Sequence, residues 1–336
     1  MNSDFNIEKY RAKIPWESIG MPVRSGGGNM SALTISKEEE KRLKGQGFLN
    51  NRGTDEFSAR VITVNGKVTA AQHRCMAEAA EKFGNGNLTY TTRLSVEIQG
   101  IPYEKIEEFQ GFIAKEGLET GGTGAKVRPV VSCKGTTCQY GLLDSYAISE
   151  EIFRRFYKGY RQVALPHKFK IAVGGCPNNC VKPNLNDVGI IGQRIPHFDS
   201  EACKGCKKCA IEAACPNKVA KVVDGKLHID EELCRHCGRC VGKCPFHSIP
   251  DGTYGFKIYI GGRWGKKISH GKALNRIFTS EEEALDVIEK AILLFKDQGL
   301  KGERFAETIE RIGFENAEKQ LLEKNLLERK MEILSK

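Results

Sequence analysis

The stretch Gly174-Gly175-Cys176-Pro177-Asn178-Asn179-Cys180 follows segment 168–173, which reads as a β-strand. A second pair of cysteines lies in Ser132-Cys133-Lys134-Gly135-Thr136-Thr137-Cys138, again after a predicted strand, 127–132. Neither pair is informative by itself, because core cysteines are common. Taken together, they make a set of four that suits a four-iron cluster.

Eight more cysteines lie between residues 200 and 250, a segment with little hydrophobic periodicity. They form the runs Cys203-x2-Cys206-x2-Cys209-x5-Cys215-Pro216 and Cys234-x2-Cys237-x2-Cys240-x3-Cys244-Pro245. Such spacings gather thiolates around a metal centre, whereas disulfides would need an oxidising compartment that nothing here suggests. Zinc is the alternative, and two four-cysteine runs ending in Cys-Pro argue against it. The remaining cysteine, Cys75, is expected to be a buried thiol on an apolar helix.

The two runs resemble the bacterial two-cluster ferredoxin module, in which the isolated fourth cysteine of each run ligates the other cluster. The resemblance implies one [4Fe-4S] cluster on Cys203, Cys206, Cys209 and Cys244, and a second on Cys215, Cys234, Cys237 and Cys240. The first run has five residues before its last cysteine where the module often has three, which predicts a local bulge. Residues 200–251 are therefore expected to form an electron-transfer insert.

Around the insert, strands alternate with helices, which predicts an α+β fold. The expected strands are 57–64, 88–98, 127–132, 168–173 and 255–260, and the expected helices are 36–44, 70–83, 103–116, 149–162, 280–297 and 303–334. Residues 25–29 and 121–124 are expected to be glycine-rich loops.

The composition narrows the class of protein. No stretch approaches the roughly 20 apolar residues that span a bilayer, and Met1–Tyr10 has no apolar signal core, so we expect a cytoplasmic protein without a membrane segment. The net charge of +10 has two interpretations: a solvated basic surface, or a charge that offsets bound clusters and attracts an anionic substrate or an acidic electron donor. No nucleic-acid recognition motif is present, and no glycine-rich turn indicates a flavin or nicotinamide fold.

The loops 132–138 and 174–180 resemble those of the nitrite and sulfite reductase family. In that family the four cysteines bind a cubane and the last one bridges to the iron of sirohaem, so the resemblance gives the cubane to Cys133, Cys138, Cys176 and Cys180, with Cys180 as the bridge. The first pair is often one residue further apart in the family. The anaerobic and dissimilatory-type sulfite reductase subunits, which carry a ferredoxin insert at this place, are the most similar subgroup.

The resemblance also implies a domain arrangement. We expect an N-terminal extension (1–54), a ferredoxin-like half-domain (55–125), a sirohaem and [4Fe-4S] reductase domain (126–199 and 252–300), the two-cluster ferredoxin insert (200–251) and C-terminal helices (301–336).

Several basic residues match positions that bind the anion or the cofactor in the family. Arg93 matches a cofactor-binding arginine, Arg128 an arginine on the distal side of sirohaem, and Lys168 and Lys170 the paired active-site lysines. Arg263, and Asn178 and Asn179 beside Cys180, complete the implied cofactor-binding set. One position departs from the family: Ile62 stands where a further arginine is frequent, and Arg60 is the nearest substitute.

The two lysines also make physical sense at an anion site. On a strand, Lys168 and Lys170 point to one face, where two ammonium groups repel each other unless an anion lies between them. A solvated strand face is the alternative. Sulfite and nitrite are anions that lose oxygen as water, so cationic donors stabilise the developing charge and deliver protons.

Full-length members of the family contain the reductase unit twice. One copy supplies the basic residues that surround the anion, and the other supplies the cysteines that bind the cluster. This chain holds one copy with both sets, which predicts a composite site in a homodimer or with a homologous subunit. We therefore expect a six-electron sulfite reductase supplied by ferredoxin or donor subunits. Nitrite reduction to ammonia and a non-catalytic electron-transfer subunit are the alternatives.

Overall fold

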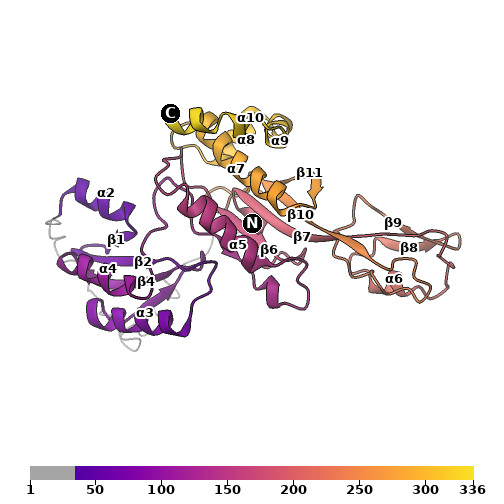
Figure 1. Ribbon diagram of the computed structural model, residues 1–336, viewed down its shortest axis with the longest axis horizontal. Coiled ribbons are helices and arrows are strands. Elements are labelled where there is room, and N and C mark those ends of the chain that lie inside the picture. The colour runs from indigo at the N-terminus through magenta and orange to yellow at the C-terminus, as the bar shows by residue number, and fades with distance from the viewer. Residues whose placement is uncertain (1–34) are drawn as a thin grey trace, which may run out of the picture.

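The structure is a computed structural model that describes residues 35–336, and its strands form three sheets (Figure 1). The order is β1-β2-β4-β3 in the first sheet, β11-β10-β7-β6-β5 in the second and β8-β9 in the third. The predicted loop at 25–29 and the segment Met1–Tyr10 lie outside the described residues. Within residues 35–336, no helix has the length and apolar character that crossing a bilayer demands.

The first sheet and its helices form one unit, which combines the predicted half-domain (55–125) with residues 37–50 of the segment predicted as an N-terminal extension. Its elements are α2 (Lys37–Gly45), β1 (Phe48–Asn50), β2 (Glu56–Val61), α3 (Ala70–Phe83), β3 (Leu88–Tyr90), β4 (Val96–Pro102) and α4 (Ile106–Ala114). Helix α3 spans the residues predicted for it, because Thr69 and Gln72 form a capping box at its start. Its apolar face packs into a core that includes Phe57, Phe109 and Cys75, as expected for that thiol.

The predicted strand 88–98 is instead a hairpin. Strands β3 and β4 pair antiparallel, and the chain turns between them, with the Leu94 N–H donating to the Thr91 carbonyl at 3.0 Å. Leu94 takes a positive φ of 61°, which a continuous strand does not allow. Arg93 therefore lies in a turn and not on a strand. The strand expected at 57–64 ends at Val61, and the helix expected at 103–116 begins with a short 3-10 turn.

The second sheet lies in the segments predicted as the reductase domain, 126–199 and 252–300. Its strands are β5 (Val131–Ser132), β6 (Ile171–Gly174), β7 (Val188–Pro196), β10 (Gly252–Ile260) and β11 (Lys272–Phe278). The neighbours β5, β6 and β7 are parallel, whereas β7, β10 and β11 are antiparallel. Strands β5 and β6 are shorter than predicted: the segments before them are joined by one isolated bridge, Val127 to Phe169.

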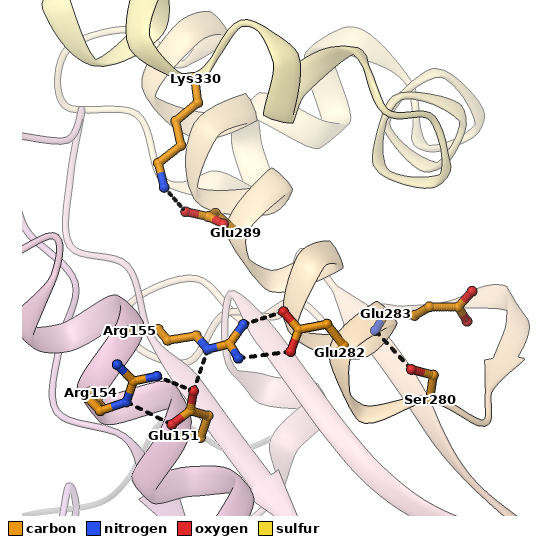
Figure 2. A network of polar contacts seen from close by, with 8 residues as sticks. All are labelled: Glu151, Arg154, Arg155, Ser280, Glu282, Glu283, Glu289 and Lys330. Carbon is orange, nitrogen blue, oxygen red and sulfur yellow. Dashed lines mark hydrogen bonds and ion pairs between the residues drawn. The ribbon is translucent and has the colours of Figure 1, made fainter.

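Helices pack on this sheet and are tied together by ion pairs. Helix α5 (Ser145–Ile152) continues as a π-helix, Phe153–Lys158, and α7 (Glu281–Gln298) is buried along most of its length. Figure 2 shows Arg155 joining Glu151 to Glu282 of α7, with Arg155 Nη2 at 2.8 Å from Glu282 Oε2. In the same view Lys330 reaches Glu289 at 2.6 Å, which fixes the C-terminal segment on α7.

The helix predicted at 303–334 is broken into short pieces. They are α8 (Phe305–Ile312), α9 (Phe314–Leu322), α10 (Asn325–Glu328) and α11 (Lys330–Ser335). Gly313, with a φ of 85°, separates α8 from α9, because a helix cannot continue through that conformation. The breaks let the segment fold back on α7 instead of extending away from it.

The insert lies at the far end of a long ribbon made by β7 and β10 (Figure 1). These strands stay paired as far as Pro196 and Gly252, and the cysteine-rich segment between them holds α6 (Ala210–Ala214), β8 (Ala220–Val223) and β9 (Lys226–Ile229). Its core is small, with Ile211, Leu227 and Ile249 packed against cysteines. So small a core depends on ligation for its stability.

We predict that Phe169→Ala destabilises the reductase domain strongly. Phe169 is 0% exposed and its ring lies 5.8 Å from that of Phe295 and 5.2 Å from that of Phe305. Loss of such a ring costs about 3–5 kcal/mol, on the order of 10 °C in the thermal midpoint of a domain this size. The exposed Leu300 provides the control, since Leu300→Ala should leave the melting curve nearly unchanged. Equal melting curves for the two variants would contradict the assigned core.

Candidate cofactor and anion site

The parallel pairing of β5 and β6 brings the two cysteine loops to one edge of the sheet. Cys133 follows β5 directly, and its N–H donates to the Val173 carbonyl of β6 at 3.1 Å. The N–H of Gly175, the residue after β6, donates to Cys133 Sγ at 3.1 Å. Burial raises the pKa of the Cys176 thiol, and the neighbouring Cys133, Cys180 and Cys138 raise it further. The four predicted cubane ligands therefore lie close enough to interact.

Two glycines allow the loops to meet. A Cβ on Gly175 would lie 2.8 Å from the Gly135 Cα and 3.4 Å from Cys133 Sγ, and a Cβ on Gly135 would lie 2.8 Å from the Gly175 Cα. Neither position has room for a side chain. The two glycines thus let the Cys133 and Cys176 loops approach each other closely.

The second loop ends in an exposed thiol. Asn179 adopts a left-handed φ of 57°, and its amide donates to Asn184 Oδ1 at 2.9 Å. This turn leaves Asn178 and Cys180 exposed, whereas Asn179 Oδ1 is buried with no donor among the described residues. Because Cys180 is exposed, its thiolate can bind a cluster and also contact a second group outside the loop.

At the opposite end of β6 lies a cluster of cations. The Arg128 N–H, just before β5, donates to the Phe169 carbonyl at 2.8 Å, so Arg128 is adjacent to both lysines. Lys168 and Lys170 precede β6 in an extended segment and are half-buried, while Phe169 between them points into the core. The alternation predicted for them is therefore present, although the strand starts only at Ile171.

The cations lower one another's pKa. Burial, Arg93 and Arg304 lower the pKa of Lys170 to about 8, against the opposing effect of Asp187. The pKa of Lys168 is lowered by burial and then by Arg304 and Arg128. Burial lowers the pKa values of Arg93 and Arg128 to about 10. This concentration of positive charge is unfavourable until an anion binds.

Arg304 and Asp187 belong to this cluster, and sequence reasoning missed both. Arg304 Nη2 lies 3.0 Å from each Asp187 oxygen, and Asp187 Oδ2 also accepts the Lys170 backbone N–H at 2.8 Å. The pair therefore holds the Lys170 backbone in place. Asp187 lies directly before the apolar run that forms β7, and this position was a weak signal of a buried, functional acid. Nothing in the sequence near Arg304 indicates a functional role.

Two of the predicted arginines, Arg93 and Arg60, are held by contacts within the protein. Arg93 donates to the carbonyls of Pro129 (2.6 Å) and Ile171 (3.1 Å) and to Asn186 Oδ1 (3.0 Å), so it ties the half-domain to the reductase sheet. Arg60 pairs with Glu97 at 2.5 Å, which offsets its charge, and Ile62 is buried at 4% exposure.

Two donors at this end are left free for a ligand. Arg128 Nη1 donates to the Gly122 carbonyl, but Arg128 Nε is buried without an acceptor among residues 35–336, and the same is true of Arg304 Nε. Buried donors of this kind normally have a partner, so they fit an anion bound among the cations. Arg263 also lies at this end, because it lowers the pKa of Lys168 and pairs with Glu307 at 2.7 Å.

Within one chain the thiols and the cations are far apart. Lys170 and Cys176 flank the two ends of β6, and the strand itself spans roughly 13 Å at about 3.3 Å per residue. The thiols and the cations of one chain therefore form two separate groups, at opposite ends of the same strand.

In the insert, the structure groups the cysteines as the ferredoxin resemblance implies for one cluster. Cys215, Cys234, Cys237 and Cys240 line one small cavity together with Pro196 and Pro216. Burial raises the pKa of Cys240 to about 11, and Cys237, Cys234 and Cys215 add to the effect. The members of the other set that pack on the insert core are Cys203, Cys209 and Cys244.

Across the described part of the chain, no three His, Cys, Asp or Glu side chains converge as they would on a single ion. A cubane holds its four thiolates further apart than one ion does. The observed grouping is compatible with that wider spacing.

Comparison with known proteins identifies relatives over most of the chain. A family model described as the nitrite and sulphite reductase 4Fe-4S domain matches residues 123–330, and one described as the nitrite/sulfite reductase ferredoxin-like half domain matches residues 50–115. An uncharacterized protein of Methanocaldococcus jannaschii is 32% identical over 80% of this chain and 92% of its own length.

Two further relatives have informative names. The coenzyme F420-dependent sulfite reductase of Methanocaldococcus jannaschii is 29% identical over 70% of this chain, which spans 37% of that protein. The crystal structure of dissimilatory sulfite reductase I superposes with a TM-score of 0.63 at 23% identity, over 79% of this chain and 69% of that one. At this identity, the superposition on dissimilatory sulfite reductase I shows that the two chains share a fold.

We predict that anion binding at the cationic end weakens as the pH rises through about 8. Lys170 is protonated and attracts the anion below its pKa of about 8, and it is neutral above that pH. Lys170→Met should bind sulfate about tenfold more weakly at pH 7, the loss of one charged hydrogen bond, and should lose this pH step. Titration calorimetry measures both, with the exposed-site variant Lys301→Met as the control. The assignment is wrong if Lys170→Met keeps the step.

Titration of the same residue affects stability. The folded pKa of Lys170 lies below its ordinary value of 10.5, so the unfolded chain binds this proton more tightly than the folded chain does. The contribution of Lys170 to the free energy of unfolding therefore increases between pH 8 and 10.5 and is lost as the pH falls through 8.

Proposed function

The chain belongs to the nitrite and sulfite reductase family, and from this premise we propose that it is a sirohaem- and iron–sulfur-dependent enzyme that reduces sulfite to sulfide. The supporting observation is the division of β5 and β6 into two chemically different ends. Four thiols gather at the carboxyl end, and a cation cluster with unpaired buried donors gathers at the other.

At the thiol end, Cys133, Cys138, Cys176 and Cys180 would hold the cubane, with the exposed Cys180 as the bridging thiolate. Asn178 and Asn179 shape the loop that presents Cys180. When bound, the cubane and sirohaem supply the path by which electrons reach the substrate. The insert would hold two more clusters, three in all, and deliver electrons singly for a six-electron reduction.

At the cationic end, Arg128, Lys168 and Lys170 would bind the oxygens of sulfite. Arg128 keeps its charge throughout, whereas Lys170, with a pKa of about 8, can release and regain a proton near neutral pH. Asp187 and Arg304 hold the Lys170 backbone, and Arg263 adds positive charge beside Lys168. These residues orient the anion and supply protons for the oxygens that leave as water.

The separation of the two ends supports a composite site. The Cys180 loop of one chain would face the cations of a partner, which is either an identical chain related by a two-fold axis or a homologous subunit. Electrons would come from ferredoxin or donor subunits.

Nitrite is the second candidate substrate, because one side of the proposed anion site has fewer free cations than the family pattern implies. Ile62 is buried, and Arg60, its possible substitute, is paired with Glu97. Fewer free cations favour the singly charged nitrite over the more highly charged sulfite.

We predict that anaerobically purified protein, made with sufficient sirohaem, shows sirohaem absorption bands and the iron content of three clusters. Turnover with one artificial donor should be faster on sulfite than on nitrite. A large preference for nitrite would favour the second substrate. Absence of sirohaem bands would identify a non-catalytic electron-transfer subunit.

We predict that two inactive variants complement each other. Lys168→Ala damages the cationic end and Cys180→Ser the thiol end, so a mixed homodimer has one intact site. Random mixing should restore about a quarter of the wild-type activity, since half of the dimers are mixed and each has one of two sites. If mixing restores nothing while the variants do form mixed dimers, the composite site is refuted.

A further inference from the structure

We infer that an acidic one-electron donor protein docks on the lysines of the Cys203–Cys209 run, and that electrons leave the insert at the Cys234–Cys240 loop, which Arg194 positions against the reductase domain. The inference rests on the proposed function in taking both cysteine sets of the insert to hold clusters. It adds the order of the two sets, the docking surface and a positioning residue.

The Cys234–Cys240 loop is joined directly to the reductase sheet. The Arg194 N–H of β7 donates to the His236 carbonyl at 2.7 Å, and Arg194 forms an isolated parallel bridge with Cys237. Gly238 adopts a φ of 65°, and a Cβ there would lie 2.8 Å from both Cβ and Cδ of Arg194. The loop therefore packs closely against the Arg194 side chain, and position 238 has no room for a side chain.

This loop also shares a groove with the predicted cubane ligands. A groove of about 410 Å³ is lined by both Cys176 and Cys237. Arg239 lies 5.4 Å from the ring of Tyr140, close in sequence to Cys138, and Arg194 lies 4.9 Å from the ring of Tyr254. These contacts span the junction between the two ligand loops.

Among the insert cysteines, Cys237 is the one that lines this groove. The run Cys203, Cys206 and Cys209 does not contribute to the lining, and the Cys244 loop contributes Lys243. Figure 1 shows the insert projecting past the ends of β7 and β10, away from the half-domain and the C-terminal helices. With the exit near Cys237, the inferred entry is the Cys203, Cys206, Cys209 and Cys244 set.

The surface around this set is basic and open. Lys204, Lys207 and Lys208 alternate with the ligand cysteines, all three are exposed, and none forms an ion pair within residues 35–336. Three unpaired lysines beside a redox centre attract an acidic surface and speed encounter. In each encounter the donor loses one electron and the insert gains one, which then passes to the reductase domain.

The docking surface is tested by charge reversal. The variant Lys204→Glu, Lys207→Glu, Lys208→Glu should be reduced by an acidic ferredoxin at least about tenfold more slowly at low ionic strength, with most of the salt dependence lost. Reduction by a neutral photoreduced deazaflavin should be unchanged. The control reverses three exposed lysines elsewhere, Lys41, Lys301 and Lys324. An unchanged rate with ferredoxin, or an equal fall in the control, overturns the assignment.

The exit is tested by a matched glycine pair. Gly238 and Gly242 both have positive φ, 65° and 69°, but a Cβ on Gly242 meets nothing within 4 Å. In stopped-flow experiments on protein with full iron content, Gly238→Ala should slow electron arrival at sirohaem by on the order of tenfold, without slowing reduction of the insert. Gly242→Ala should do neither. If Gly238→Ala and Gly242→Ala transfer electrons to sirohaem at the same rate, the Cys234–Cys240 loop is not the exit.

The two tests separate failure of this inference from failure of the proposed function. Freeze-quench EPR follows the insert and the Cys133, Cys138, Cys176 and Cys180 cubane independently of substrate turnover. A protein that lacks sirohaem but whose cubane is still reduced through the Gly238 junction would refute the proposed activity and keep the electron path. Suppose instead that the protein has sirohaem and normal turnover, and that its Gly238→Ala variant transfers electrons at the wild-type rate. That result would refute the electron path and keep the proposed activity.

Discussion

The parallel pairing of β5 and β6 is the constraint on which the rest of the structure depends. Parallel neighbours end at the same edge of a sheet, so two loops from distant parts of the chain are brought together there. The backbones of Gly135 and Gly175 meet so closely that side chains are excluded. The same pairing brings the segments before the strands together at the other edge, which is why the thiols and the cations form two separate groups.

The cationic end concentrates positive charge at a cost that the fold offsets. Lys168, Lys170 and Arg128 all have lowered pKa values, so their charged forms are destabilised in the free protein. Asp187 and Arg304 form a buried pair beneath them, and Phe169 anchors the intervening backbone in the core. The fold thereby holds these cations close together, and the proposed anion would reduce their mutual repulsion.

The insert and the reductase domain are linked through a small area. The ribbon of β7 and β10 carries the insert outward, while the Cys234–Cys240 loop returns to contact Arg194. A rigid connection at one loop and an open basic surface at another suit a module that receives electrons from a mobile donor and passes them to a fixed acceptor. In the composite site proposed above, the separation of thiols from cations within one chain would make assembly with a partner part of the chemistry.

The sequence by itself determined the features that are local along the chain. The cysteine runs and the Lys-Phe-Lys alternation were visible because their residues are neighbours, and helix α3 was predictable in full because Thr69 and Gln72 cap it. The resemblance to the family, which the comparisons support, came from the same local motifs.

Only the tertiary structure decided which distant residues meet. Arg304 joins Asp187 across more than a hundred residues, and Arg194 meets Cys237 through strand pairing that no local pattern encodes. The hairpin turn that holds Arg93 depends on the pairing of β3 with β4, which packing against the half-domain core selects over a continuous strand. Ligand identity is thus a property of short motifs, whereas the charge around an anion and the route between two centres are properties of the folded chain.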